Sequence, residues 1–560
     1  MKNRIKQYLL AASMCVGLTA CSDFFEPIPG VQFGLDETFA SKQRTEEYLN
    51  NVYSYVREVT DAIHPNTYGG IFTEASLDGA NRWNKTYAEW TNGSFNSASA
   101  QASEYFSKYY QAIAKASTFI QNVDKCTEAA ASTRGKWKSE ARALRAYYYF
   151  ELLRLYGPIP LIGEDPIPLD ASLEELIKER NSVDECVNFI ATELQSAIDS
   201  GDLLQRAGKA NLGRMDVATC MALKAKLYLY WASPLFNGNT DQASVKNKDG
   251  KQLFPQTEDN SKWAQARDAY ERFMTFATGQ GYKLTEVYTN GKLDPYASCR
   301  AAGEFFTTTW EAVDELIFVK LRDLYDYTYW VCPKFTDFQD TDVTGGGGYY
   351  TTQETVDLFF TKDGLTIEED PGYDKFEGIP SANNFTSGRY YDPNNPSRLY
   401  FDADKSKVLK QWKDREPRFY VNITYSGSIW LNEGKYNEEM RTDFTNGANG
   451  TCGKSKASGD CPDSGYLIRR GAKASNNNGS KHFSPVLRLA DMYLGYAEAL
   501  CMCSDLDNAL TYLNKIRVRA GIPEYTFTAT AGKITCPKTQ TDLLNRIRRE
   551  RLVELVFEWN

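Results

Sequence analysis

The chain has 560 residues, with 64 Lys and Arg against 73 Asp and Glu, and 42% of its residues are hydrophobic. This composition is that of a globular protein, and the length allows about three or four domains or one large body built from repeats. The formal net charge of −9 argues against nucleic-acid binding, because a phosphate backbone is bound by a basic surface. Since His64 and His482 are its only histidines, a three-histidine zinc site is excluded, and no metal or cofactor is expected.

Residues 1–20 have the pattern of a signal peptide. Three basic residues precede a mostly apolar run at 8–20, which is shorter than the ~20 residues that a membrane-spanning helix needs. The sequence LTAC at 18–21 resembles a bacterial lipobox, so cleavage before Cys21 and lipidation of its thiol are expected. The acidic sequence after it resembles export tags of surface lipoproteins in Bacteroidota. The alternative is a plain secretory signal that contains a cysteine.

The segment 21–280 is expected to be an N-terminal helical region. Apolar residues recur on two stripes of 139–156, so this helix is expected to pack between two neighbours, with Tyr147–Tyr149 in the core. Small residues recur along the 214–232 helix and would allow a partner helix to approach closely. Helices are predicted near 104–123, 139–156, 183–200, 214–232 and 262–277.

The segment 281–485 is rich in Gly, Asn, Asp and Thr, which predicts a loop-rich insertion with short strands at most. Helical periodicity returns in the C-terminal region 486–560. Helices are predicted there at 486–503, 506–520 and 541–558. Helical pairs about 34–40 residues apart are typical of tetratricopeptide repeats. The predicted fold is therefore mostly α, a tetratricopeptide-like superhelix with a large loop-rich insertion that contributes to a ligand site.

Four sequence blocks carry a resemblance to a known family. They are SEARALRAYYYFELLRLYGPIPL (139–161), RLADMYLGYAEAL (488–500), ALTYLNKIRVRAGIP (509–523) and RIRRERLVELVFE (546–558). These blocks resemble those of the SusD/RagB family, surface glycan-binding lipoproteins of Bacteroidota. Because family members usually continue beyond the last block, whereas this chain stops at Asn560, the C-terminal region is expected to be truncated.

The resemblance implies a function as well as a fold. It implies a non-catalytic, lipid-anchored protein on the cell surface of the outer membrane. Such a protein captures an oligo- or polysaccharide and delivers it to a partner, a SusC-like TonB-dependent outer-membrane barrel, on which it acts as a hinged lid.

Two aromatic segments, 78–92 and 324–335, are the expected ligand site. A sugar presents C–H faces and a rim of hydroxyls, so its site needs flat rings with short polar groups beside them. Tyr325, Tyr327 and Tyr329 could equally be one face of a strand; Trp330 breaks this alternation and is the preferred platform ring. The expected ligand-binding residues are Trp83, Tyr87, Trp90, Asn81, Arg82, Asn92, Tyr327, Tyr329 and Trp330.

Other functions stay open at this point. A glycoside hydrolase with two carboxylates cannot be rejected by sequence, although no catalytic motif supports it. A lid without its own binding site, and a member that binds peptide or another nutrient, are further alternatives. Gly345–Gly348 lacks the lysine and following helix of a phosphate-binding loop. The acidic residues at 337–342 miss the spacing of a calcium-binding loop, and a solvated acidic loop is favoured.

Overall fold

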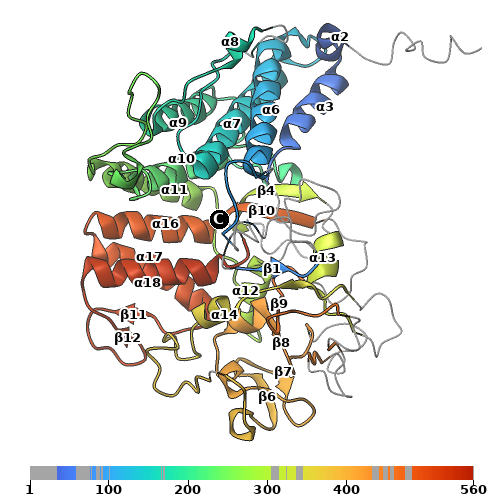
Figure 1. Ribbon diagram of the computed structural model, residues 1–560, viewed down its shortest axis with the longest axis vertical. Coiled ribbons are helices and arrows are strands. Elements are labelled where there is room, and N and C mark those ends of the chain that lie inside the picture. Colours follow the sequence, from blue (N-terminus) through green and yellow to red (C-terminus); the bar gives the residue numbers. More distant parts are fainter. Residues whose placement is uncertain are drawn as a thin grey trace, which may run out of the picture.

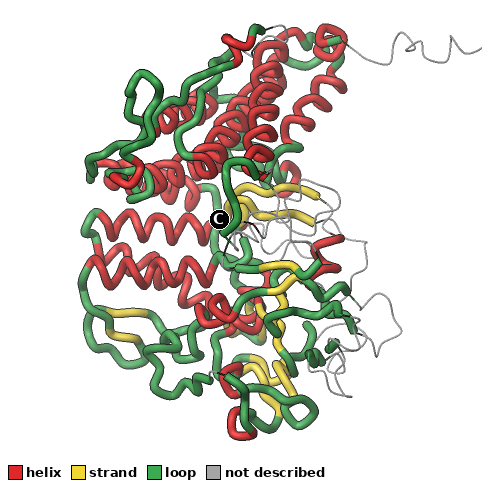
Figure 2. The backbone as a smooth tube through the Cα atoms, viewed as in Figure 1, coloured by secondary structure: helices red, strands yellow, loops and turns green. Residues whose placement is uncertain are grey.

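The structure is a computed structural model with two parts, an array of helices and a body of loops and small sheets (Figure 1; Figure 2). The predicted signal peptide, Cys21, Tyr87, Trp90, Asn92 and the acidic segment 337–342 lie outside the described residues. The structure describes residues 34–57, 76, 78–83, 89, 93–99, 101–165, 167, 171–303, 314–322, 325–335, 345–376, 378–431, 441–444, 452–453, 459–472 and 482–558.

The helical array is built from segments at both ends of the chain. Apart from the short α8, each helix contacts the next one in the array, and α11 packs on α16, so the C-terminal helices continue the array begun by the N-terminal ones (Figure 1). This arrangement confirms the mostly α, tetratricopeptide-like prediction. The helices are α2 (Leu35–Ala40), α3 (Lys42–Tyr53), α6 (Gln101–Asn122), α7 (Ala131–Tyr156), α8 (Leu173–Leu176), α9 (Val183–Asp199), α10 (Val217–Ala232), α11 (Ser261–Gly279), α16 (Leu489–Met502), α17 (Leu506–Ala520) and α18 (Gln540–Glu554).

Helix α7 is packed on two sides, as its two apolar stripes predict. It contacts α6 and α9, and the rings of Tyr147, Tyr148 and Tyr149 are buried. The Tyr148 hydroxyl donates to the Val52 carbonyl at 2.5 Å, and the Tyr149 hydroxyl donates to the Ile162 carbonyl at 2.8 Å. These tyrosines therefore belong to the helical core, with their polar tips satisfied by backbone.

The loop-rich part contains more regular structure than its composition predicts. Its short helices are α12 (Pro295–Ala302), α13 (Tyr325–Val331), α14 (Gln353–Leu358) and α15 (Pro417–Asn422). Proline at the first position of α12 and α15 has the fixed φ and the missing N–H that suit a helix start. Short 3-10 turns lie at Val123–Lys125, Lys209–Asn211, Thr240–Gln242, Ala382–Asn384 and Lys410–Trp412.

The strands form several small sheets rather than one layer. A four-stranded sheet has the order β1-β5-β9-β8, from β1 (Ala80–Asn81), β5 (Tyr349–Tyr350), β8 (Ile423–Tyr425) and β9 (Tyr466–Ile468). The longer strands β4 (Leu316–Arg322) and β10 (His482–Arg488) pair antiparallel. The other pairs are β2 (Tyr288–Thr289) with β3 (Lys292–Leu293), β6 (Arg389–Asp392) with β7 (Asn395–Asp402), and β11 (Tyr525–Thr526) with β12 (Ile534–Thr535).

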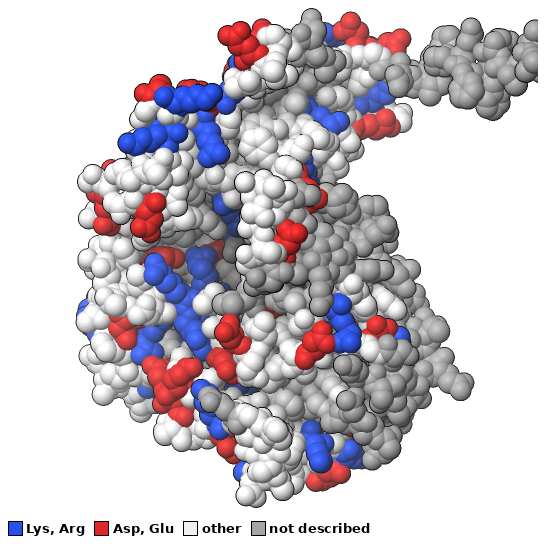
Figure 3. All heavy atoms as spheres, in the orientation of Figure 1, with Lys and Arg blue, Asp and Glu red and all other residues white. Residues whose placement is uncertain are grey.

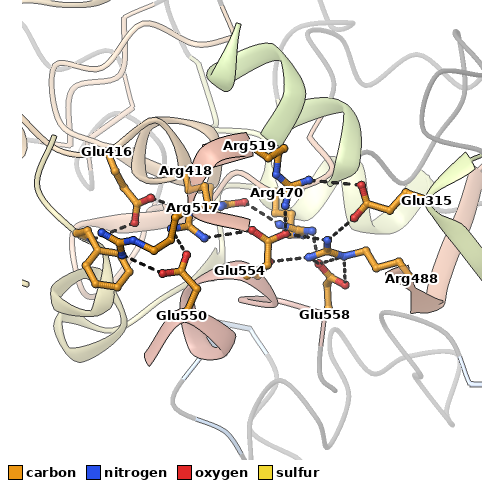
Figure 4. A network of polar contacts seen from close by, with 12 residues as sticks. Glu315, Glu416, Arg418, Arg470, Arg488, Arg517, Arg519, Glu550, Glu554 and Glu558 are labelled. Carbon is orange, nitrogen blue, oxygen red and sulfur yellow. Dashed lines mark hydrogen bonds and ion pairs between the residues drawn. The ribbon is translucent and has the colours of Figure 1, made fainter. Parts of the chain in front are cut away.

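A buried network of arginines and glutamates joins the C-terminal helices to the loop-rich part (Figure 4). Glu554 on α18 binds Arg418, Arg488 and Arg519, with nitrogen–oxygen distances of 3.1 Å to Arg418 and 2.7 Å to Arg488. Arg488 also binds Glu315 at 2.7 Å. The network residues are Glu315, Glu416, Arg418, Arg470, Arg488, Arg517, Arg519, Glu550, Glu554 and Glu558, and all are buried. Buried charges are tolerated only when paired, so these contacts fix how the two parts are joined.

Gly521 marks a close approach between the end of α17 and α12. It follows the last helical residue with φ 74°, and a Cβ atom there would lie 2.4 Å from Cγ of Pro295. We expect Gly521→Ala to lower the free energy of unfolding by about 2–4 kcal/mol, because it adds an overpacking cost to the strain of the left-handed backbone. Urea denaturation measures this loss.

Gly532 provides the matched control for this substitution. It also has φ 74°, but nothing lies within 4 Å of the Cβ that Gly532→Ala would add. We expect this control to lose only about 1 kcal/mol, the cost of the backbone conformation alone. Equal losses for the two variants would show that the contact with Pro295 does not constrain the fold.

Candidate functional site

The four-stranded sheet positions the first aromatic segment. Asn81 on β1 pairs with Tyr349 on β5, and the backbone N–H of Arg82 donates to the Gly348 carbonyl at 2.9 Å. Asn81 is buried, and its side-chain oxygen accepts a hydrogen bond from the backbone N–H of Trp83 at 3.0 Å. The ladder and this side-chain contact together set where Trp83 leaves the sheet.

The glycine run 345–348 is docked on the end of α13. The N–H groups of Gly345, Gly346 and Gly347 donate to the carbonyls of Pro333, Tyr329 and Cys332 at 3.0, 2.8 and 2.9 Å. The bond from Gly346 satisfies a carbonyl in the last turn of α13, which the helix end leaves without an intrahelical partner. A Cβ at Gly345 would lie 2.3 Å from the Cys332 carbonyl oxygen, so the run is glycine-rich because two backbones meet there.

Trp83 and Tyr329 both lie against this glycine run. A Cβ at Gly346 would be 2.7 Å from the Trp83 ring and 2.9 Å from the Tyr329 ring, and one at Gly348 would be 2.4 Å from Trp83. The Trp83 side chain is half-buried, whereas the Tyr329 ring is exposed. Two rings from segments far apart in the sequence are thus brought to one place.

Charged side chains surround the two rings. The indole N–H of Trp83 donates to Asp460 Oδ1 at 2.9 Å, and Lys334 Nζ lies 2.5 Å from Asp460 Oδ2. Arg82 forms an ion pair with Asp463 and donates to the Cys461 carbonyl at 3.4 Å. We call the set Arg82, Trp83, Tyr329, Lys334, Asp460 and Asp463 the Trp83 cluster. Its members are partly exposed, so rings and hydrogen-bonding groups are presented together.

The expected platform ring Trp330 is buried instead. It is 6% exposed and packs in the core of the loop-rich part with Tyr327 and Tyr349. Tyr327 is fully buried, its hydroxyl donates to the Arg470 carbonyl at 2.8 Å, and burial raises the pKa of its phenol. The physical reason is that 325–331 is a helix, on which Tyr327 and Trp330 are three apart and share one face. Neither ring can offer a face to a ligand, and the strand alternative is wrong as well.

The sequence prediction also missed half of the cluster. Asn81 was expected to contact ligand, but it is buried against the Trp83 backbone. Lys334 lies in the second aromatic segment without having been selected, and Asp460 and Asp463 come from a turn-rich segment more than 370 residues beyond Trp83 in the chain. A composition of Gly, Ser and Asp indicates a turn, but it does not say which distant ring the turn approaches.

The carboxylates of the Trp83 cluster are paired with basic side chains. Among the described residues there is no group of three or more His, Cys, Asp or Glu side chains that could hold a metal ion. Each described carboxylate of the cluster is engaged by a basic side chain, Asp460 by Lys334 and Asp463 by Arg82. Within the described part, no helix is long and apolar enough to cross a membrane.

The described surface carries charges of both signs. On the face in Figure 3, basic side chains gather over the C-terminal helices with acidic ones beside them. Arg546 on α18 pairs with Asp542 and Glu369 at 2.8 and 3.1 Å, and Arg548 pairs with Glu498 at 3.4 Å. This pairing differs from the continuous basic face that binds nucleic acid.

The helical array with a loop-rich body defines a class of protein, and comparison with known sequences gives its family. The sequence model described as the SusD family matches residues 315–560. A second model, described as starch-binding associating with outer membrane, matches residues 32–229. The chain belongs to the SusD/RagB family. This confirms the resemblance carried by the four sequence blocks.

Three individual relatives are between 17% and 27% identical to this chain. A curated SusD-like protein of Bacteroides ovatus is 27% identical over 175 residues, which is 30% of this chain and 30% of the relative. The solved structure of BT4246 is 24% identical, with a TM-score of 0.71 over 93% of this chain and 87% of that one. A SusD-like carbohydrate-binding protein, BF0978 of Bacteroides fragilis, is 17% identical, with a TM-score of 0.61 over 93% of this chain and 85% of that one. The structural likenesses support the fold.

Proposed function

We propose that this protein is a non-catalytic glycan-binding protein that holds its ligand at the Trp83 cluster. The observation that carries the proposal is the placement of a half-buried indole and an exposed phenol on one glycine run, beside charged groups. The rings suit the C–H faces of a sugar, and the charged groups suit its hydroxyls. The carbohydrate-binding description of the structural neighbour BF0978 supports this ligand class.

The expected affinity is modest. Two stacked rings would give about 1 kcal/mol each beyond burial, and two or three hydrogen bonds would add about 1 kcal/mol each. Burial of the sugar's C–H faces adds a few kcal/mol to these contributions, and association and ordering costs offset part of the total, so we expect a binding free energy of roughly −4 to −7 kcal/mol, or a Kd between about 1 mM and about 10 μM. Such affinity suits a protein that must release what it captures.

The proposed setting is the cell surface. A lipidated Cys21 would anchor the protein to the outer membrane, where it would deliver glycan to a SusC-like TonB-dependent barrel as a hinged lid. The lipobox-like sequence at 18–21 and the family description "associating with outer membrane" support this setting.

Retention on polysaccharide gels tests the binding function. We expect the wild type to be retarded on at least one gel from a panel of starch, β-glucan, xylan, galactomannan and pectin. Trp83→Ala should weaken retention about tenfold or more and Tyr329→Ala about fivefold, because each substitution removes a ring that stacks on the sugar. Circular dichroism and melting curves should show that both variants are folded.

Tyr288→Ala is the matched control, since Tyr288 is 60% exposed and belongs to the separate β2–β3 pair. Its retention should equal that of the wild type. Wild-type retention by Trp83→Ala and Tyr329→Ala would contradict the proposed site. Oligosaccharide released from the gel by the wild type would contradict the non-catalytic function and favour the hydrolase alternative.

A further inference from the structure

A cavity lies on the loop-rich part, beside the four-stranded sheet. Its volume is about 590 Å³, and both aromatic and polar side chains line it. None of the predicted ligand-binding residues that the structure describes lines it. Its lining residues include Gln353, Asp357, Lys375, Phe376, Gln411, Trp412, Phe444 and Tyr466.

Gln411 carries the strongest sign of a ligand. This residue is only 6% exposed and lines the cavity. Among the described residues, no group forms a hydrogen bond with its side-chain amide, although its backbone carbonyl accepts from Tyr373 and Arg415 at 3.4 Å. The amide atoms are not among the described side-chain atoms that are buried without a partner, so they reach the cavity and can bond to water or to a ligand there. The cavity is the place from which Gln411 can be satisfied.

A chain of hydrogen bonds orders the polar wall of the cavity. The Trp412 indole N–H donates to the Tyr466 hydroxyl at 3.1 Å, and this hydroxyl donates to Gln353 Oε1 at 2.7 Å. The Gln353 amide in turn donates to Asp357 Oδ1 at 2.8 Å. Each donor therefore has a defined direction, and the wall ends on a carboxylate that can accept further hydrogen bonds. Preorganised polar groups beside rings suit a ligand that is rich in hydroxyls.

The cavity adjoins the Trp83 cluster along the chain. Asp460 and Asp463 belong to the cluster, and the next residues, Ser464 to Tyr466, line the cavity. Tyr466 begins β9, which pairs with β5, the strand that follows the glycine run. One short segment therefore separates the two places, and an extended ligand could contact both.

We propose that this cavity is a second carbohydrate subsite, which binds another stretch of the same glycan chain that the Trp83 cluster holds. Gln411 hydrogen-bonds a sugar hydroxyl there, and Phe376 and Phe444 contact the sugar's apolar face. The proposal rests on the proposed glycan-binding function and makes it more specific, because it assigns an oligosaccharide of several residues as the ligand. Longer oligosaccharides then bind more tightly than short ones, since the second contact becomes intramolecular.

Titration calorimetry with two lengths of one glycan tests this subsite. The probes are maltohexaose, cellohexaose, xylohexaose and mannohexaose, and each is compared with its disaccharide. We expect wild type to bind one hexasaccharide at least tenfold more tightly than its disaccharide. Gln411→Met and Phe376→Ala should each weaken hexasaccharide binding about fivefold to tenfold. Gln411→Met keeps the side-chain length and removes only the unpaired amide, so its melting temperature should not fall.

The controls separate the two proposals. Tyr288→Ala should bind both lengths like wild type. Wild-type hexasaccharide affinity in both Gln411→Met and Phe376→Ala, together with weakened binding in Trp83→Ala, would overturn the second subsite and leave the proposed function standing. If wild type binds none of the hexasaccharides and is retained on none of the polysaccharide gels, the proposed function fails, and the subsite fails with it.

Discussion

Glu554→Gln should lower the free energy of unfolding by about 3–5 kcal/mol, the cost of breaking a buried ion pair. Glu554 faces Arg418, Arg488 and Arg519, so its neutralisation leaves three buried guanidinium groups short of one negative charge. Glutamine has nearly the same volume, so the loss reports charge rather than a cavity. Urea denaturation followed by circular dichroism measures the change.

Asp507→Asn is the control for this substitution. Asp507 pairs with Lys538 at 2.7 Å, but the side chains are 74% and 52% exposed, and exposed pairs contribute at most about 1 kcal/mol. We expect its unfolding midpoint to match that of the wild type. A Glu554→Gln protein as stable as Asp507→Asn would mean that the buried network does not hold the two parts together.

The stability of the protein should be highest near pH 4. Burial raises the pKa of Asp216 to about 6, although N–H groups of Thr219 and Ala207 donate to it and partly oppose the shift. The native state therefore binds a proton more tightly than the unfolded state does, so its stability falls as pH rises from about 4 to about 6. This carboxyl alone should cost about 2–3 kcal/mol at pH 7 relative to pH 4.

Below about pH 4, the stability should change in the opposite direction and decrease as the pH falls. Burial acts to raise the pKa of Asp491, but Lys226 and Arg551 outweigh it and hold the pKa well below its ordinary value. At Glu554, burial likewise acts to raise the pKa, but Arg519, Arg488 and Arg418 outweigh it, so the pKa of this carboxyl is also lowered. Because these two carboxyls have lower pKa values in the folded state than in the unfolded state, they stabilise the fold above about pH 4. This contribution is lost as the pH falls.

Urea unfolding midpoints measured between pH 3 and pH 8 test both the expected loss of stability above pH 4 and the expected loss below it. Asp216→Asn keeps a side-chain acceptor at the start of α10 and should make the decrease in stability between pH 4 and pH 6 smaller, while leaving the loss of stability below pH 4 unchanged. A variant curve with the wild-type slope above pH 5 would show that Asp216 is not the group responsible.

The helices could be predicted because their periodicity is local. The predicted segment 183–200 is α9, at Val183–Asp199, and 506–520 is α17, at Leu506–Ala520. Helix α7 begins at Ala131, eight residues before the predicted 139, because its first two turns are mostly polar and show no stripe. Pattern reading thus finds a helix where one face is apolar and misses the turns that extend beyond it.

The site could be predicted only in part. The segment with Tyr325, Tyr327 and Tyr329 is compatible with the two-residue alternation of a strand and also with a helix. The sequence alone does not decide between these two structures. In the short α13, Trp330 and Tyr327 are buried, whereas Tyr329 is exposed. Trp83 and Tyr329 of the Trp83 cluster come from the two predicted aromatic segments, whereas Trp330, the preferred ring of the second segment, is buried.

The buried network shows what a single sequence cannot reveal. Arg519 and Glu315 are 204 residues apart in the chain and form a buried ion pair. The block RIRRERLVELVFE contains both Glu554, which is buried, and Arg548, whose side chain is 48% exposed. Local composition is the same for both, so only the tertiary fold separates the structural charge from the surface one.

A crystal structure of the protein with the hexasaccharide that it binds most tightly tests the central claim most directly. We expect one sugar ring to stack on the Trp83 indole or the Tyr329 phenol, with hydroxyls within hydrogen-bonding distance of Arg82, Lys334, Asp460 or Asp463. A sugar chain bound elsewhere, with both rings of the Trp83 cluster uncovered, would contradict this account.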